Sequence, residues 1–206
     1  MYAQSSELLW EPEFSVNLTS EIPWVFSFGL AYRAMLSAHE DGEKISEFNN
    51  EHFELNHFTT YLASENSAFS LGVRYRFRET FDDSRYDELR FIEQYSYSHP
   101  NSSWGLGHRF RLEQRLRNVE NILRLRYQIG ISKPLSSTFA WGFSTEALLE
   151  ISSSSKPALE QRFTLELENT SFENLKLKLG LDYQMDEYNL DLVNQFYILS
   201  GASLSL

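Results

Sequence analysis

Apolar and polar residues alternate along most of this 206-residue chain. Residues 109–116 read Arg-Phe-Arg-Leu-Glu-Gln-Arg-Leu, and residues 70–78 and 123–129 repeat the alternation with their own arginines. Successive side chains of a β-strand point to opposite faces of its sheet, so each of these segments has one apolar face and one charged face. The pattern predicts β-strands, one face of which is rich in arginine.

Eleven such segments follow one another, and no helical stripe competes with them. Strands with lipid-facing apolar residues and lumen-facing ionic residues are typical of membrane β-barrels. We therefore predict an all-β, antiparallel up-and-down transmembrane β-barrel with a charged lumen, formed as a single domain over residues 1–206. The expected strands cover residues 10–18, 24–33, 52–61, 69–78, 88–97, 104–116, 123–131, 139–150, 160–167, 175–183 and 196–206.

The number of segments is at odds with barrel architecture. Bacterial single-chain barrels have an even number of strands, so we expect ten or twelve.

Pro12 cannot donate to a ladder, which places the first segment at an edge or interrupts it. Glu93 breaks an apolar face and predicts a bulge or an aqueous strand end. We expect a polar loop over residues 37–46, long connections near residues 41, 82 and 154, and short ones near residues 19, 65, 100, 134 and 170.

Composition narrows the function classes. The formal net charge of −11 argues against nucleic acid as a partner, because that would call for a basic patch. The chain has no cysteine, which excludes disulfides and cysteine-based metal sites. Aromatic residues make up 15%, and we expect Trp24, Trp104 and Trp141 to anchor strand ends at a membrane interface. Residues 1–3, Met-Tyr-Ala, resemble the remnant of a signal peptide cleaved after Ala3.

Several strings resemble one known family. They are residues 108–115, the Leu-Arg-Leu-Arg-Tyr of residues 123–127 and the Lys-Pro-Leu of residues 133–135. They resemble an uncharacterised outer-membrane β-barrel family common in Bacteroidota, of the type called domain of unknown function 2490. The strand around Glu146, Gln161-Arg162 and residues 179–183 are similar to its closing part. The resemblance covers the chain from about Trp10 and implies the outer membrane of a Gram-negative bacterium, but it assigns no activity and no catalytic residue.

The inward-facing arginines are the main candidates for a function. Guanidinium groups bind carboxylates and phosphates through paired donors, so they would suit a narrow anion-selective porin for acidic solutes or oligosaccharides. Inward glutamates such as Glu54, Glu88 and Glu160 favour a salt-bridge network instead, because buried charges are normally paired. The candidate lumen-binding residues are Arg74, Arg76, Arg78, Arg109, Arg111, Arg115, Arg124, Arg126, Arg162, Glu113 and Glu146.

Our first hypothesis is a structural or passive barrel, or a subunit of an envelope complex. Its expected partners are outer-membrane lipid, other envelope proteins and an anionic solute in the lumen. The histidines lack metal-ligand spacing, and we expect no metal, cofactor or catalytic residue. A lipid-modifying enzyme that uses Ser70, His52 and Glu54 is a further alternative. The competing fold is a soluble β-sandwich or lipocalin-like barrel, which would turn the apolar faces inward.

Overall fold

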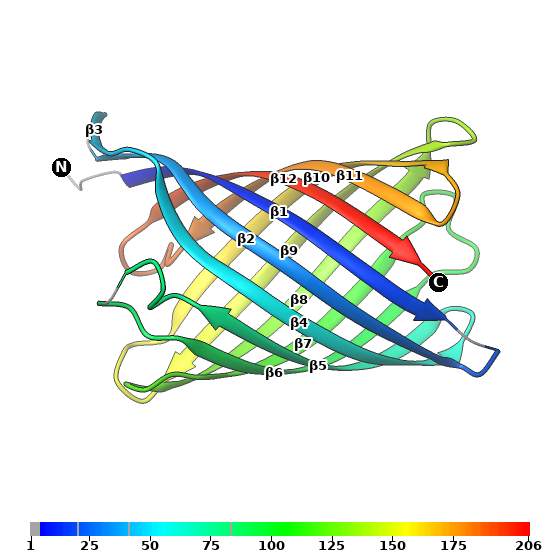
Figure 1. Ribbon diagram of the computed structural model, residues 1–206, viewed down its shortest axis with the longest axis horizontal. Helices are drawn as coiled ribbons and strands as arrows, with labels where there is room; N and C mark the ends of the chain where they lie inside the picture. The colour runs from blue at the N-terminus through cyan, green and yellow to red at the C-terminus, as the bar shows by residue number, and fades with distance from the viewer. Residues whose placement is uncertain (1–4, 20, 41, 83) are drawn as a thin grey trace.

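The chain folds into a rolled β-sheet, seen from the side in Figure 1. This computed structural model describes residues 5–19, 21–40, 42–82 and 84–206, so the expected signal-peptide remnant, residues 1–3, lies outside the described residues. In those residues no helix is long and apolar enough to cross a membrane.

The strands are β1 (Ser5–Thr19), β2 (Trp24–Glu40), β3 (Glu43–Ser46), β4 (Asn49–Ser64), β5 (Ser67–Phe77), β6 (Glu88–Ser98), β7 (Gly107–Leu116), β8 (Asn121–Pro134), β9 (Phe139–Ser152), β10 (Ala158–Phe172), β11 (Leu175–Asp186) and β12 (Val193–Ser205).

The sheet closes on itself. Strands β4 to β12 pair antiparallel in chain order, β2 pairs with β4, and β1 pairs with β2 on one side and with β12 on the other. The pairing of β1 with β12 is parallel. All strands except β3 belong to the wall, which therefore has eleven strands in the described chain. The all-β up-and-down barrel is confirmed, but the wall departs from the expected ten or twelve strands, because a parallel closure accepts an odd number.

The first strand is a full member of the wall and not an edge. Its register with β12 runs without a break through Pro12, which pairs with Ser200. On the other side, the ladder to β2 joins Trp10 to Ala34 and Glu13 to Ala31, and it omits the two residues between them. The expected interruption is therefore present only on the β2 side, where proline has no N–H to donate.

Two local expectations were wrong. Residues 37–46 are not simply a loop, because β2 continues to Glu40 and β3 folds back on it as a short hairpin outside the wall (Figure 1). Glu93 causes no bulge, since its pairings with Leu71 and Leu112 lie in ladders without a register shift. It is an exposed residue in the middle of β6.

The two ends of the barrel differ in their connections. We call one the loop end; it carries β3 and residues 78–87, 117–120, 153–157 and 187–192. The other, the turn end, carries residues 20–23, 65–66, 99–106, 135–138 and 173–174. The alternation of long and short connections agrees with the sequence, except that residues 99–106 form one of the longer connections. Trp24, Trp104 and Trp141 all belong to the turn end, where Lys133 Nζ lies 4.6 Å from the Trp104 ring centroid.

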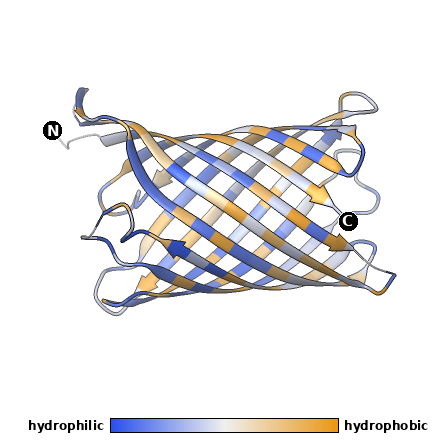
Figure 2. Ribbon diagram, in the orientation of Figure 1, coloured by the Kyte–Doolittle hydropathy of each residue, from blue (hydrophilic) through white to orange (hydrophobic). Residues whose placement is uncertain are grey.

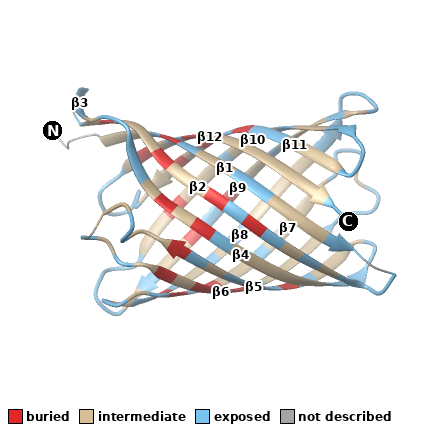
Figure 3. Ribbon diagram, viewed as in Figure 1, coloured by how far each residue is buried: buried red, intermediate tan, exposed pale blue. Residues whose placement is uncertain are grey.

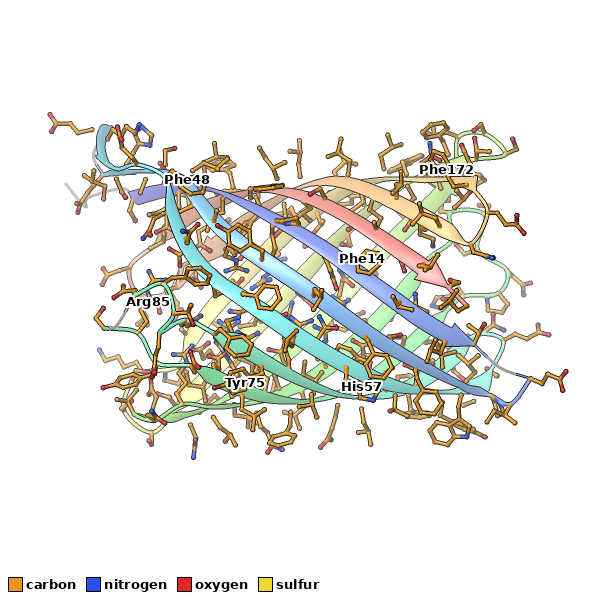
Figure 4. The ribbon with its side chains drawn as sticks, viewed as in Figure 1. Phe14, Phe48, His57, Tyr75, Arg85 and Phe172 are labelled. Atoms are coloured by element: carbon orange, nitrogen blue, oxygen red, sulfur yellow. The ribbon has the colours of Figure 1, made fainter. Side chains whose placement is uncertain are left out.

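The outer face of the wall is apolar. Hydrophobic and hydrophilic residues alternate along the strands (Figure 2), and Figure 4 shows Phe14 on the outside of β1. Leu71, for example, is 66% exposed. This outward orientation contradicts the lipocalin-like alternative, whose apolar side chains would fill the interior. Every wall strand contributes at least one exposed large apolar residue: Phe14, Phe28, Leu55, Leu71, Phe91, Phe110, Leu125, Phe143, Leu165, Leu181 and Phe196.

The interior is filled unevenly. Nearly all buried residues lie in the half of the barrel next to the loop end, as the front strands show in Figure 3. They include the charged side chains of Glu88, Glu113 and Arg90. Toward the turn end, inward positions carry small residues such as Gly130 and Ser144, which face each other across β8 and β9. The polar core of the barrel therefore occupies one half of its length.

We predict that Gly72→Ala destabilises the barrel by about 1–3 kcal/mol, because it overpacks the interior. The inward ring of Phe58 lies across Gly72, and a Cβ there would stand 2.3 Å from Phe58 Cε1. Urea unfolding in detergent micelles measures the change. Gly142→Ala is the matched control, since its Cβ would meet nothing closer than 3.5 Å. Equal effects of the two substitutions would contradict the packing of Phe58 over Gly72.

Candidate functional site

Arginine and glutamate side chains form ion pairs throughout one half of the barrel interior, and we call the whole set the arginine–glutamate network. Alternation along the strands aims these side chains inward, and six strands from β5 to β10, together with β4, contribute them. Within the described residues, ten arginines share six glutamates through ion pairs. The members are Arg74, Arg76, Arg90, Arg109, Arg111, Arg115, Arg117, Arg124, Arg126, Arg162, Glu54, Glu88, Glu113, Glu146, Glu150 and Glu160.

Glu113 lies at the centre of the network. Its carboxylate is fully buried and accepts a hydrogen bond of 2.7 Å from Arg126 Nη1 and a longer one of 3.4 Å from Arg111 Nη1. Arg90 Nη1 lies 3.8 Å from its other oxygen. Arg126 also donates to Glu146, which in turn accepts from Arg109 Nη2 at 3.1 Å. One carboxylate thus holds guanidinium groups from three neighbouring strands in place.

Glu88 plays the same part nearer the loop end. It is also fully buried and pairs with Arg90, with Arg115 Nη2 at 2.9 Å and with Arg117 Nε at 2.5 Å. Arg115 reaches across β8 to Glu150 at 3.1 Å and so connects this part to β9. The network is therefore continuous from β6 to β10.

The register places like charges opposite each other. Arg90 pairs with Arg74 on one side and with Arg115 on the other, and Arg111 pairs with Arg126. Like charges directly opposite each other destabilise a sheet. The glutamates at diagonal positions offset this repulsion. Neither residue type would be stable at these positions without the other.

The other half of the lumen is hollow. A cavity of about 510 Å³, which we call the vestibule, reaches from the network to the turn end. Arg109, Glu146 and Arg162 lie where it meets the network, and Glu166 and Lys178 lie nearer its opening. The vestibule exists because the wall around it carries glycine, serine and threonine: Gly130, Ser132, Gly142, Ser144 and Thr164.

Comparison with known proteins gives a family for this fold. The family model described as "Protein of unknown function (DUF2490)" matches residues 13–192. The chain belongs to this family. Comparisons with curated proteins and with solved structures found no match.

The inward arginines expected from the sequence of this DUF2490 protein are brought together, with one exception. Arg78 lies just beyond β5 and makes no ion pair with any described residue, whereas the other ten candidates belong to the network. Sequence reasoning left Arg90, Arg117 and Glu150 out of the candidate set. The alternation within β6 and β9 signals Arg90 and Glu150, but Arg117 follows β7 in a connection, where alternation carries no information.

The residues of the enzyme alternative do not meet. Ser70 pairs with Thr60 on β4 and shares a hydrogen bond of 2.9 Å with its hydroxyl group. His52 lies eight positions away along the same strand, which corresponds to about 26 Å. Glu54 is occupied by Arg74 and Arg76. The DUF2490 barrel therefore does not assemble a Ser–His–acid arrangement from these residues.

A different histidine pair was not expected. Nε2 of His99 lies 3.0 Å from Nε2 of His108, and His108 Nδ1 lies 2.8 Å from the Tyr127 hydroxyl group. These side chains are exposed at the turn end and do not contact the network. The β6–β7 ladder brings the two histidines together, because Tyr97 pairs with His108 and the His99 N–H donates to the Leu106 carbonyl oxygen at 2.8 Å. In the described part of the chain, no three His, Cys, Asp or Glu residues gather as a metal site.

We predict that Glu113→Gln lowers the free energy of unfolding by about 3–5 kcal/mol, because it leaves buried guanidinium groups without their counter-charge. Glu166→Gln is the control. Its partner Lys178 is half exposed at 3.8 Å, so its loss should cost less than about 1 kcal/mol. Denaturant titration of both variants in the same detergent provides the comparison. If Glu113→Gln costs no more than Glu166→Gln, the network does not stabilise the barrel.

Proposed function

We propose that this DUF2490 protein is an integral outer-membrane barrel of a Gram-negative bacterium, with a lumen closed to ions. Its role is that of a structural, non-conducting barrel that can serve as a subunit of an envelope complex. One observation carries the proposal: the closed wall is apolar outside, and its lumen is filled by ion pairs over half its length.

The outer face supports the membrane part of the proposal. Exposed apolar side chains surround the wall on all eleven strands, far more than monomers leave in water. A closed sheet leaves no unpaired backbone edge, which is the condition for crossing hydrocarbon. Aromatic residues form a row in register across five strands, as expected of an interfacial girdle: Tyr61, Phe69, Tyr95, Phe110 and Tyr127.

The network supports the closed lumen. Glu88 and Glu113 have no exposed surface, so no continuous water path passes along their side chains. Side chains just fill the interior of an eight-stranded barrel, and the wider interior of this eleven-stranded barrel is filled by long arginine and glutamate side chains over half its length. Barrels of the outer membrane carry longer loops outside the cell, so we place the loop end outside and the vestibule toward the periplasm. Outer-membrane lipid and other envelope proteins are the partners that this placement offers.

The purified protein is expected to need detergent for extraction and to migrate differently on a gel before and after heating. In planar bilayers it should give no steady current, because the ion pairs close the lumen. Ready solubility as a monomer without detergent would contradict the membrane proposal.

An anion-selective pore is the second candidate. The excess of arginine over glutamate in the network favours it, since unneutralised guanidinium groups attract anions. A steady, anion-selective current in the same bilayer measurement would support this candidate and overturn the closed-lumen proposal.

We also predict that Glu93→Leu stabilises the barrel in phospholipid vesicles by about 1 kcal/mol, because an acidic residue on the lipid face is destabilising. Glu93 is exposed on the outer face between Leu71 and Leu112. Leu71→Glu, in the same row, should lower the free energy of unfolding by a similar amount. Measured in detergent-free vesicles, a neutral effect of both substitutions would show that this row lies outside the hydrocarbon.

A further inference from the structure

Positive charge is concentrated at the loop-end mouth of the lumen. Three successive wall strands meet there: Arg78 follows the end of β5, Glu88 begins β6, and Arg117 follows the end of β7. Glu88 already pairs with Arg90, Arg115 and Arg117. One carboxylate therefore serves three guanidinium groups before Arg78 is counted.

Arg78 is held in position by its backbone and not by its side chain. Its backbone N–H donates to Asp87 Oδ1 at 2.8 Å, and the other oxygen of Asp87 accepts from the Tyr75 hydroxyl group at 2.8 Å. Asp87 is thus engaged by the backbone and by a residue on the outer face. The Arg78 guanidinium has no hydrogen bond or ion pair to any described residue, and its Nε is buried without an acceptor.

The surroundings of Arg78 are strongly cationic. Burial and the neighbouring charge of Arg76 lower the pKa of Arg78, which lies beyond the end of β5, to about 10. Arg117 adds a further positive charge, and Glu88 is the carboxylate that opposes them. A buried guanidinium N–H without an acceptor is costly, whereas an anion that accepts its hydrogen bond removes that cost.

We infer that the loop-end mouth binds a tetrahedral oxyanion, phosphate or sulfate, between the guanidinium groups of Arg78 and Arg117. Several oxygens on one small anion match the planar forks of two guanidinium groups, which chloride cannot do. The oxyanion can be a free solute or the phosphate group of a lipid head group, and both present the same chemistry to this site. The inference concerns binding in the folded barrel and does not require that the lumen conduct.

Because the protein is acidic overall, we expect an anion to bind at the loop-end mouth and not at the surrounding surface. The formal net charge is −11, yet twelve of the thirteen arginines lie on the wall strands or in residues 78 and 117, and only Arg85 belongs elsewhere. The connection 78–87 itself carries Glu79, Asp82 and Asp87, of which Asp82 is engaged by Ser84 and Arg85. An anion is therefore repelled by the rim and is held only where the arginines exceed the carboxylates.

The test measures binding of sodium phosphate to the full folded chain in a zwitterionic detergent by isothermal titration calorimetry. Sodium chloride at equal ionic strength is the blank. We expect saturable phosphate binding that Arg78→Gln weakens by about tenfold or more. Lys156→Gln is the matched control, because it removes one exposed positive charge at the same end of the barrel and should leave binding unchanged.

A second arm distinguishes the two sources of phosphate. Mixed micelles contain a phosphorylated glycolipid or the same lipid without phosphate. Binding of the phosphorylated lipid, lost in Arg78→Gln, together with weak binding of free phosphate assigns the site to a head group. The reverse pattern assigns it to a solute.

Two results would overturn the inference. One is the absence of binding in both arms, and the other is binding that neither Arg78→Gln nor Arg117→Gln weakens. Loss of folding does not confuse the test, because Arg78 makes no ion pair with any described residue whose loss would destabilise the barrel. Without phosphate, Arg78→Gln should unfold at the same temperature as the wild type or at a higher one. Arg78→Lys, which keeps the charge but loses the two-donor fork, should bind with intermediate strength.

Discussion

The parallel pairing of β1 with β12 is the contact on which the rest of the structure depends. It joins the two ends of the sheet over most of β1, from Ser5 to Asn17. Without it the sheet would have two open edges, and there would be no inside in which to enclose ionic side chains. Because the pairing is parallel, β1 begins with Ser5 at the loop end and the chain reaches Leu206 at the turn end, where Figure 1 marks the C-terminus.

Closure creates an interior in which unpaired charges are costly. The side chains of the arginine–glutamate network offset that cost because they pair with one another. Each of Glu88 and Glu113 serves several guanidinium groups, and those on the strands would be repelled by a cross-strand arginine if the carboxylate were absent. The network is short of acceptors, with ten arginines for six glutamates among the described residues. Because carboxylates are in short supply, guanidinium groups of the lumen are left able to bind an anion. The shortage of carboxylates is greatest at Arg78 and Arg117.

The sequence was informative for the strands and less so for their ends. Strict alternation identified the outward Phe110 and the inward Arg111, since each pleat position has only one face. It failed for Glu93, where an acidic residue in an apolar row predicted a bulge or an aqueous strand end, although the ladder continues through it in the middle of β6. It also missed Arg117 and the hairpin of β3, because residues outside a regular strand have no periodicity to follow.

The sequence by itself determined the class of fold, the two faces of each strand and the charges that regular strand positions direct into the lumen. The family that the comparison shows is the one that the sequence strings resemble. Only the tertiary structure decided the number of wall strands, because that number depends on how the first and last strands meet and not on either alone. It also decided which carboxylate serves which arginine, why Arg78 pairs with no carboxylate of the described residues, and which half of the lumen is filled. Those outcomes depend on register and tilt between strands far apart in the chain, and alternation within one strand carries no information about them.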